Sequence, residues 1–157
     1  WSPSGCWSPS TDVADVGARW HDPRMTGIQR LRPEGLVRSP AFSHAVVVPP
    51  GGTTIYVGGQ NAVDADGALV GPDDIVAQSL RAVANVKVAL AAAGASVADV
   101  LQWTVLFADG VDIGAAYGAI AREIAADPPA LVTAARVAGL AVPGALIEVA
   151  AVAAVIR

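Results

Sequence analysis

The sequence has few residues of the kinds that form disulfides, bind metals or carry charge. It contains one cysteine, Cys6, and two histidines among 157 residues. No intramolecular disulfide can form, and no Cys/His spacing indicates a metal site. Charged residues make up only 15% of the chain, with a net charge of −4 and no basic stripe. We therefore expect neither nucleic acid nor an anionic membrane as a partner, and the cysteine usage fits a reducing cytoplasm.

Long apolar runs free of charges and turn signals are also missing. No window of eighteen or more residues is of that kind, so we expect no membrane span. Nevertheless, 54% of the residues are hydrophobic, more than one domain of this length needs for its own core. This surplus predicts that the chain assembles with copies of itself.

Residues 1–24 lack a helical or strand period, and they lack the basic start and apolar centre of a signal peptide. Trp-Ser-Pro occurs twice in them, and a Ser/Pro-rich composition is typical of segments that do not fold. The only methionine, Met25, comes directly afterwards. We expect residues 25–157 to form one domain. We favour an upstream sequence outside the fold for residues 1–24, and the alternative is a genuine extension that covers a surface.

From Met25 onward, apolar periods and turn signals predict strands and helices in alternation. Strands are expected at 26–32, 45–48, 53–57 and 100–107, with 45–48 and 53–57 paired as a hairpin. Helices should begin at an N-cap near Asp73 and again near Asp112, and they should end at Gly94 and before Pro128. The face that the first helix should bury consists of Val76, Leu80, Val83, Val86 and Leu90.

The C-terminal part is the most informative. Two runs rich in Val, Ile, Leu and Thr lie on either side of Pro143-Gly144, which predicts a β-hairpin within 131–156. In the second run Glu148 interrupts about a dozen apolar residues, where an ionised group must find a partner or face a cavity. The order of elements predicts an α+β fold of two layers with helices on one sheet face. The apolar residues of 149–156 predict that the other face contacts copies of the chain.

Several segments, in this order along the chain, resemble the Rid family, also called YjgF, the reactive intermediate deaminases. They are Ser39-Pro40-Ala41-Phe42-Ser43-His44-Ala45, Ile55-Tyr56-Val57-Gly58-Gly59-Gln60, Ala93-Gly94-Ala95-Ser96, Pro129-Ala130 and Ile147-Glu148-Val149. The resemblance covers roughly residues 36 to 157. It implies a chorismate-mutase-like fold with a mixed sheet, a homotrimer with small-molecule sites between subunits, and C–N bond hydrolysis that needs neither metal nor organic cofactor.

The resemblance also implies which residues act on the substrate. Glu148 matches the glutamate that positions the attacking water, although it also fits a structural carboxylate bonded to backbone amides between subunits. In the family an arginine of a Pro-Ala-Arg triplet holds the substrate carboxylate through a two-pronged contact. Here that position is Leu131, or Val132 if the register moves by one. The chain therefore resembles a divergent member without the family's substrate-binding arginine.

Other positions around the expected pocket also differ from the family. Phe42 stands where the family has an aromatic residue that is often tyrosine, and Gly58, next to Gly59, stands where it often has serine. Tyr117 falls near the family's helix asparagine, and a simple core aromatic is the alternative. These differences predict a more apolar pocket.

Arg136 and His44 are weaker candidates. Arg136 lies four or five residues beyond the missing arginine, about 13 to 17 Å along a strand, so a surface or inter-subunit ion pair is the better interpretation. His44 follows Ser43, but adjacent strand residues point to opposite faces, so the two cannot form a catalytic dyad.

Two function classes remain open. The first is a cofactor-independent hydrolase that acts on a reactive imine or enamine without a carboxylate, and not on 2-iminopropanoate. The second is a non-catalytic trimer that binds a small ligand or a protein. We favour the enzyme. Its expected site contains the catalytic Glu148 and the substrate-binding residues Phe42, Gly58, Gly59, Tyr117, Leu131 and Val132.

Overall fold

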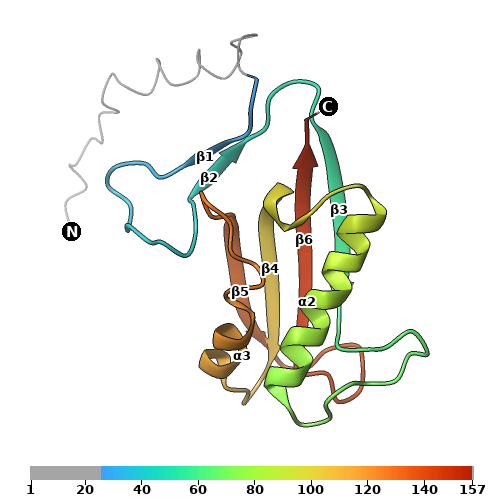
Figure 1. The fold of residues 1–157 in the computed structure, drawn as a ribbon. Coiled ribbons are helices and arrows are strands. Elements are labelled where there is room, and N and C mark those ends of the chain that lie inside the picture. The colour runs from blue at the N-terminus through green and yellow to red at the C-terminus, as the bar shows by residue number, and fades with distance from the viewer. Residues whose placement is uncertain (1–25, 157) are drawn as a thin grey trace, which may run out of the picture.

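The computed structural model of the protein describes residues 26–156, so the interpretation of residues 1–24 lies outside it. The strands are β1 Gln29–Leu31, β2 Ala45–Val47, β3 Thr53–Gln60, β4 Val100–Ala108, β5 Leu131–Val137 and β6 Ile147–Val155. The helices are α2 Ile75–Ala92 and α3 Ile113–Ile120, with a short 3-10 turn at Val97–Asp99. Strands β3 to β6 form one mixed sheet in the order β3-β6-β4-β5, while β1 and β2 form a separate pair (Figure 1).

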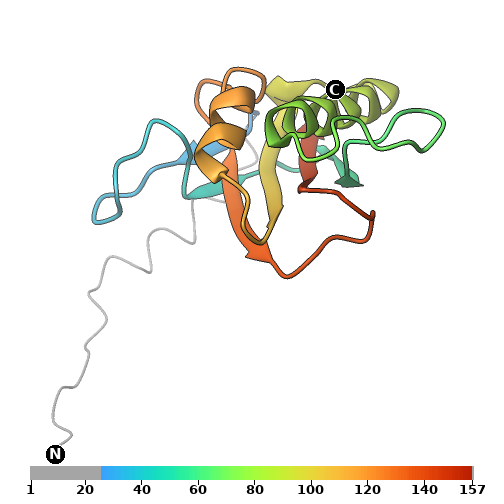
Figure 2. The ribbon, with the colours of Figure 1, turned by 90° about the horizontal axis from the view of Figure 1, so that it is seen from below.

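The fold has the predicted two layers. Both helices cover one face of the four-stranded sheet, as Figure 2 shows from below. The core lies between the layers, and its large side chains include Val83, Val86, Leu90, Trp103, Phe107, Ile120, Ile147 and Val149. We call the sheet face turned away from α2 and α3 the outer face. Its residues include Tyr56, Gln102, Thr104, Leu106, Leu131, Glu148 and Val152.

Neither predicted hairpin forms. Strand β2 pairs with β1, and β3 pairs with β6. Strand β4 lies between β5 and β6, parallel to the first and antiparallel to the second. Helix α3 connects β4 to β5, which lies beside it and parallel to it. The connection from β5 to β6 is long enough to place β6 on the other side of β4. A Pro-Gly signal marks a change of direction, but it does not determine which strand becomes the neighbour.

Helix α2 starts one residue later than predicted. Its N-cap is Asp74, whose carboxylate accepts hydrogen bonds from the N–H groups of Val76 and Ala77, both at 3.0 Å. Asp73 has a φ of 62° and precedes the cap. The buried face is also rotated, because Val76 and Leu80 are exposed whereas the residues that the helix buries are Gln78, Ser79, Ala82, Val83, Val86 and Leu90.

The end of α3 and the composition of α2 also need comment. Helix α3 begins at its Asp112 N-cap as predicted but ends at Ile120, well before Pro128. Helix α2 is long and apolar enough to cross a membrane by length and composition alone. Its buried side chains, however, pack against the sheet. A core helix of a globular domain has the same composition, so this property carries no further conclusion.

Candidate functional site

Glu148 projects from β6 onto the outer face. It lies opposite Leu106 of β4, which in turn lies opposite Ala135 of β5. Residues aligned across neighbouring strands point to the same side of a sheet, so these three side chains form one row. Glu148 is half-buried, and its carboxylate has no hydrogen-bond or ion-pair partner within residues 26–156. The carboxylate is therefore available to bind water or a ligand.

Gly59 of β3 borders this carboxylate, and Gly58 precedes it in the same strand. The pairing of β3 with β6 becomes irregular between Val57 and Gln60. At Gly59 an added Cβ would lie 2.9 Å from Glu148 Cγ and still closer to the carboxylate. At Gly58 an added Cβ would meet nothing within 4 Å. Gly59 thus provides the space that the Glu148 side chain occupies, whereas Gly58 borders open space.

Two buried amides hold the backbone directly before Glu148, and a third, half-buried amide supports one of them. The side chain of Gln78, fully buried in α2, accepts a hydrogen bond from the Leu146 N–H at 2.8 Å. The Asn61 side chain donates to the Ile147 carbonyl at 2.9 Å. Asn85 in turn donates to the Asn61 carbonyl at 2.9 Å. The sequence analysis did not identify these amides as positioning residues, and the signal that would have found them is an amide within an apolar helical face.

Arg136 lies on the opposite side of the sheet from Glu148. It is aligned with Phe107, a core residue, and its guanidinium donates to the Val111 carbonyl at 3.0 Å. Glu148 and Arg136 are the only charged residues in β3 to β6. Arg136 is therefore placed to fix the loop before α3, and it cannot replace the missing arginine beside Glu148 in this chain.

The pairing of β5 with β4 shows where the two residues aligned with the family's arginine, Leu131 and Val132, lie in the fold. Leu131 is aligned with Gln102 and lies on the outer face with Glu148, whereas Val132 is aligned with the buried Trp103 and points toward the helices. On the outer face, however, Leu131 is four residues further along the strands than Glu148, about 13 Å, and two strands away. One chain alone does not bring Leu131 and Glu148 into one pocket.

The segment before β2 places Phe42 at the start of β5. The hydroxyl of the buried Ser43 donates to the Pro129 carbonyl at 2.6 Å, and the Ser43 N–H donates to the Ala130 carbonyl at 3.1 Å. Phe42 packs edge-on against His44, with ring centroids 5.4 Å apart. Ser43 and His44 therefore point apart, as predicted, and Phe42 lies close to Leu131 rather than to Glu148.

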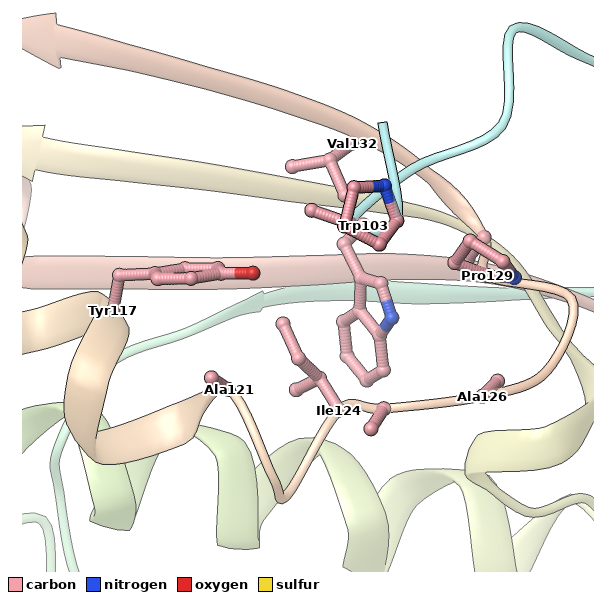
Figure 3. A pocket seen from close by; sticks show the side chains of 11 residues that line it. Trp103, Tyr117, Ala121, Ile124, Ala126, Pro129 and Val132 are labelled. Carbon is pink, nitrogen blue, oxygen red and sulfur yellow. The ribbon is translucent and has the colours of Figure 1, made fainter. Parts of the chain in front are cut away.

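Tyr117 and Val132 line a cavity on the helix side of the sheet (Figure 3). Tyr117 is 46% exposed, so it is not a buried core residue. Within one chain, the sheet separates both residues from Glu148. The expected site residues thus form three groups: Glu148 with Gly58 and Gly59, Leu131 with Phe42, and Tyr117 with Val132. Within residues 26–156 no cluster of three His, Cys, Asp or Glu residues suits a metal ion.

The fold and this face define an α+β protein whose open sheet surface carries a single carboxylate. Comparison with known proteins gives the family. The sequence model described as Endoribonuclease L-PSP matches residues 36–155. The chain therefore belongs to this family, also known as the YjgF or Rid family, which confirms the resemblance noted in the sequence.

Solved structures support this membership. A Rid-family protein of unknown function from Yersinia pestis is 36% identical, with 82% of this chain and 98% of that chain covered and a TM-score of 0.70. The YjgF gene product of E. coli is 32% identical over 66% of this chain and 84% of that one, with a TM-score of 0.54. A YjgF/YER057c/UK114-family member from Mycobacterium tuberculosis is 28% identical, covers 72% and 86%, and has a TM-score of 0.53. No curated protein matches.

Proposed function

We propose that this protein hydrolyses a reactive imine or enamine that has no carboxylate, at a site between subunits, with Glu148 positioning the attacking water. The observation that carries the proposal is the unpartnered Glu148 carboxylate on the outer face, with the backbone directly before it held by Gln78 and Asn61. A carboxylate on a backbone fixed in this way needs less reorganisation when it binds water. The leucine at position 131 argues against a substrate carboxylate.

The reaction needs one general base and one water. As water adds to the C=N carbon, the Glu148 carboxylate takes one water proton and passes it to the nitrogen, which forms a neutral carbinolamine. The carboxylate then takes the hydroxyl proton of the carbinolamine as the C–N bond breaks and gives it to the leaving nitrogen, so that a carbonyl compound and ammonia leave. Atoms and charge balance with the carboxylate regenerated. A positioned carboxylate typically contributes to such proton transfers by about 10² to 10⁴-fold in rate.

A second copy of the chain would complete the site. Leu131 and Phe42 lie far from Glu148 along one sheet, so a pocket that contains all three needs the sheet of another subunit. The outer face is suited to this contact: Tyr56 is 80% exposed on it and lies next to the half-buried Val152. We propose a homotrimer, the assembly that the family resemblance implies.

Assembly can be tested on the outer face itself. The unmodified chain should behave in light scattering as a particle of about three times the 15.8 kDa chain mass. Val152→Asp should reduce it to the monomer mass, because burying an unpaired carboxylate at a contact costs several kcal/mol. Val88→Asp is the matched control, since Val88 is 70% exposed on α2 in the other layer. A monomeric parent protein, or equal masses for all three proteins, would contradict the inter-subunit site.

Substrate preference tests the proposed reaction. Imines are generated in the assay by an oxidase, either from a simple primary amine or from an amino acid, and semicarbazide traps the imine that remains. The protein should reduce trapping of the neutral imine and leave trapping of the 2-imino acid almost unchanged. An apolar wall at Leu131 leaves a carboxylate desolvated and unpaired. Strong turnover of 2-imino acids by the unmodified protein would refute the proposal.

The second candidate is a non-catalytic trimer that binds a small ligand or a protein. The observation that favours it is the loss of polar groups, since Phe42 and Gly58 provide no hydroxyl and Leu131 no cation. Absence of turnover with every neutral imine would support this candidate. We do not extend the nuclease activity in the family's description to this chain, because its net charge of −4 disfavours RNA binding.

A further inference from the structure

The sheet is irregular beside Glu148. The alignment of β3 with β6 is regular up to Val57 and resumes only at Gln60. In the described part of the chain, Gly58 and Gly59 have no aligned residue on β6, and Glu148 has none on β3. Ladder hydrogen bonds hold neighbouring strands at a fixed distance, and a bulge interrupts them locally. A contact outside the ladder is therefore needed to fix the gap between Gly59 and Glu148.

Asn61 bridges the two strands at this point. It follows β3 directly and is 8% exposed. Its side-chain amide donates to the carbonyl of Ile147, the residue before Glu148, at 2.9 Å. The end of β3, the start of α2 and the connection into β6 lie at the same end of the sheet (Figure 1). The bond from Asn61 thus joins the end of β3 to the start of β6 and limits how far Gly59 and Glu148 can separate.

Helix α2 holds Asn61 from the other layer. The Asn85 side chain donates to the backbone carbonyls of Asn61 and Val63, both at 2.9 Å. Arg81, one turn earlier on α2, also donates to the Val63 carbonyl, at 3.1 Å. The backbone at 61–63 is therefore fixed to α2. A chain of hydrogen bonds runs from Asn85 through Asn61 to the backbone directly before Glu148.

We propose that Asn61 and Asn85 are positioning residues for the hydrolysis, and that they affect the chemical step rather than substrate binding. This role rests on the proposed function, because it acts through Glu148. Both side-chain amides donate to backbone carbonyls, and their effect on the substrate comes from where they hold the carboxylate and its water. A misplacement of about 1 Å can lower a rate by about 100-fold. Loosening this contact should therefore be visible in kcat.

Leucine variants test this role, since leucine is close to asparagine in size and has no donor. Asn61→Leu and Asn85→Leu should each lower kcat for a neutral imine by about tenfold to 100-fold, with little change in KM. Asn85→Ala, with a good helix former, serves if the leucine variant does not fold. Ser96→Ala is the control for lost stability. Its hydroxyl bonds to Asp99 at 2.9 Å, beyond the C-terminal end of α2, so this change should lower the melting temperature and leave kcat unchanged.

Double variants separate positioning from a general loss of stability. In a Glu148→Gln protein, Asn61→Leu should cause no further loss of rate, because no base is left to misplace. The Asn61→Leu/Asn85→Leu protein should lose about as much as Asn61→Leu alone, since the two amides act in series.

Three results would overturn the positioning role and leave the proposed function intact. They are parent kcat values in both single leucine variants, a loss confined to KM, and an equal loss from Asn61→Leu with and without Glu148→Gln. No turnover by the parent protein, or the parent rate in Glu148→Gln, would overturn the proposed function and the positioning role with it.

Discussion

Replacing Glu148 by glutamine is expected to lower the rate of neutral imine hydrolysis by roughly 10² to 10⁴-fold, the usual contribution of a positioned base. Glutamine has almost the same shape as glutamate, so the space beside Gly59 stays filled. The amide, however, cannot take the proton from water. The measurement is the rate of semicarbazide-sensitive imine loss, with the melting temperature and particle mass as checks that fold and assembly are intact.

The two neighbouring glycines give a matched pair for the same test. Gly59→Ala should displace the Glu148 side chain and lower the rate by up to about 100-fold, since a misplacement of about 1 Å can have that effect. Gly58→Ala adds the same methyl group where nothing of the same chain lies within 4 Å, so it should leave Glu148 in place and lower the rate much less than Gly59→Ala. A Glu148→Gln protein with the parent rate would show that the carboxylate is structural, and would favour the binding module over the enzyme.

Periodicity predicted the elements of this fold because it reports which side chains one helix or strand buries. The four strands of the mixed sheet and both helices were found in this way, and Glu148 was recognised from its apolar surroundings alone. Periodicity does not predict which strands are neighbours in the sheet. The Pro-Gly signal favoured pairing of strand β6 with β5, whereas β6 pairs with β3 and β4. The choice depends on core packing between distant segments.

The candidate site was predicted between subunits, and within one chain its residues lie in three groups. An alignment register does not say which face of β5 a residue occupies, so Leu131 and Val132 were equivalent in the sequence and lie on opposite faces in the fold. The rotated face of α2 has a similar cause. Gln78 is polar, but its amide binds the Leu146 N–H and two carbonyls, and these bonds compensate its burial. Hydrophobic pattern alone assigns such a residue to the surface.

Introducing an arginine at position 131 should create the activity that the unmodified protein is expected to lack. A bidentate arginine contributes roughly 1.5 to 3 kcal/mol to carboxylate binding, which corresponds to about tenfold to hundredfold in affinity at 1.4 kcal/mol per tenfold. Leu131→Arg should therefore raise 2-imino acid turnover by about this factor. The assay is again imine loss in the presence of semicarbazide, with the imine generated from an amino acid.

Three further variants determine whether the gain arises in the proposed way. Val132→Arg places the cation on the helix side of the sheet, beside Trp103, so it should give no gain. Leu131→Arg combined with Glu148→Gln should be inactive, because the new arginine binds the substrate carboxylate but supplies no base. Leu131→Arg combined with Val152→Asp should also be inactive, since Leu131 and Glu148 of one chain are too far apart to share a substrate and the site needs a second subunit. A Leu131→Arg protein that assembles but is inactive on both neutral imines and 2-imino acids would contradict the enzyme and leave Glu148 as a structural carboxylate of a binding protein.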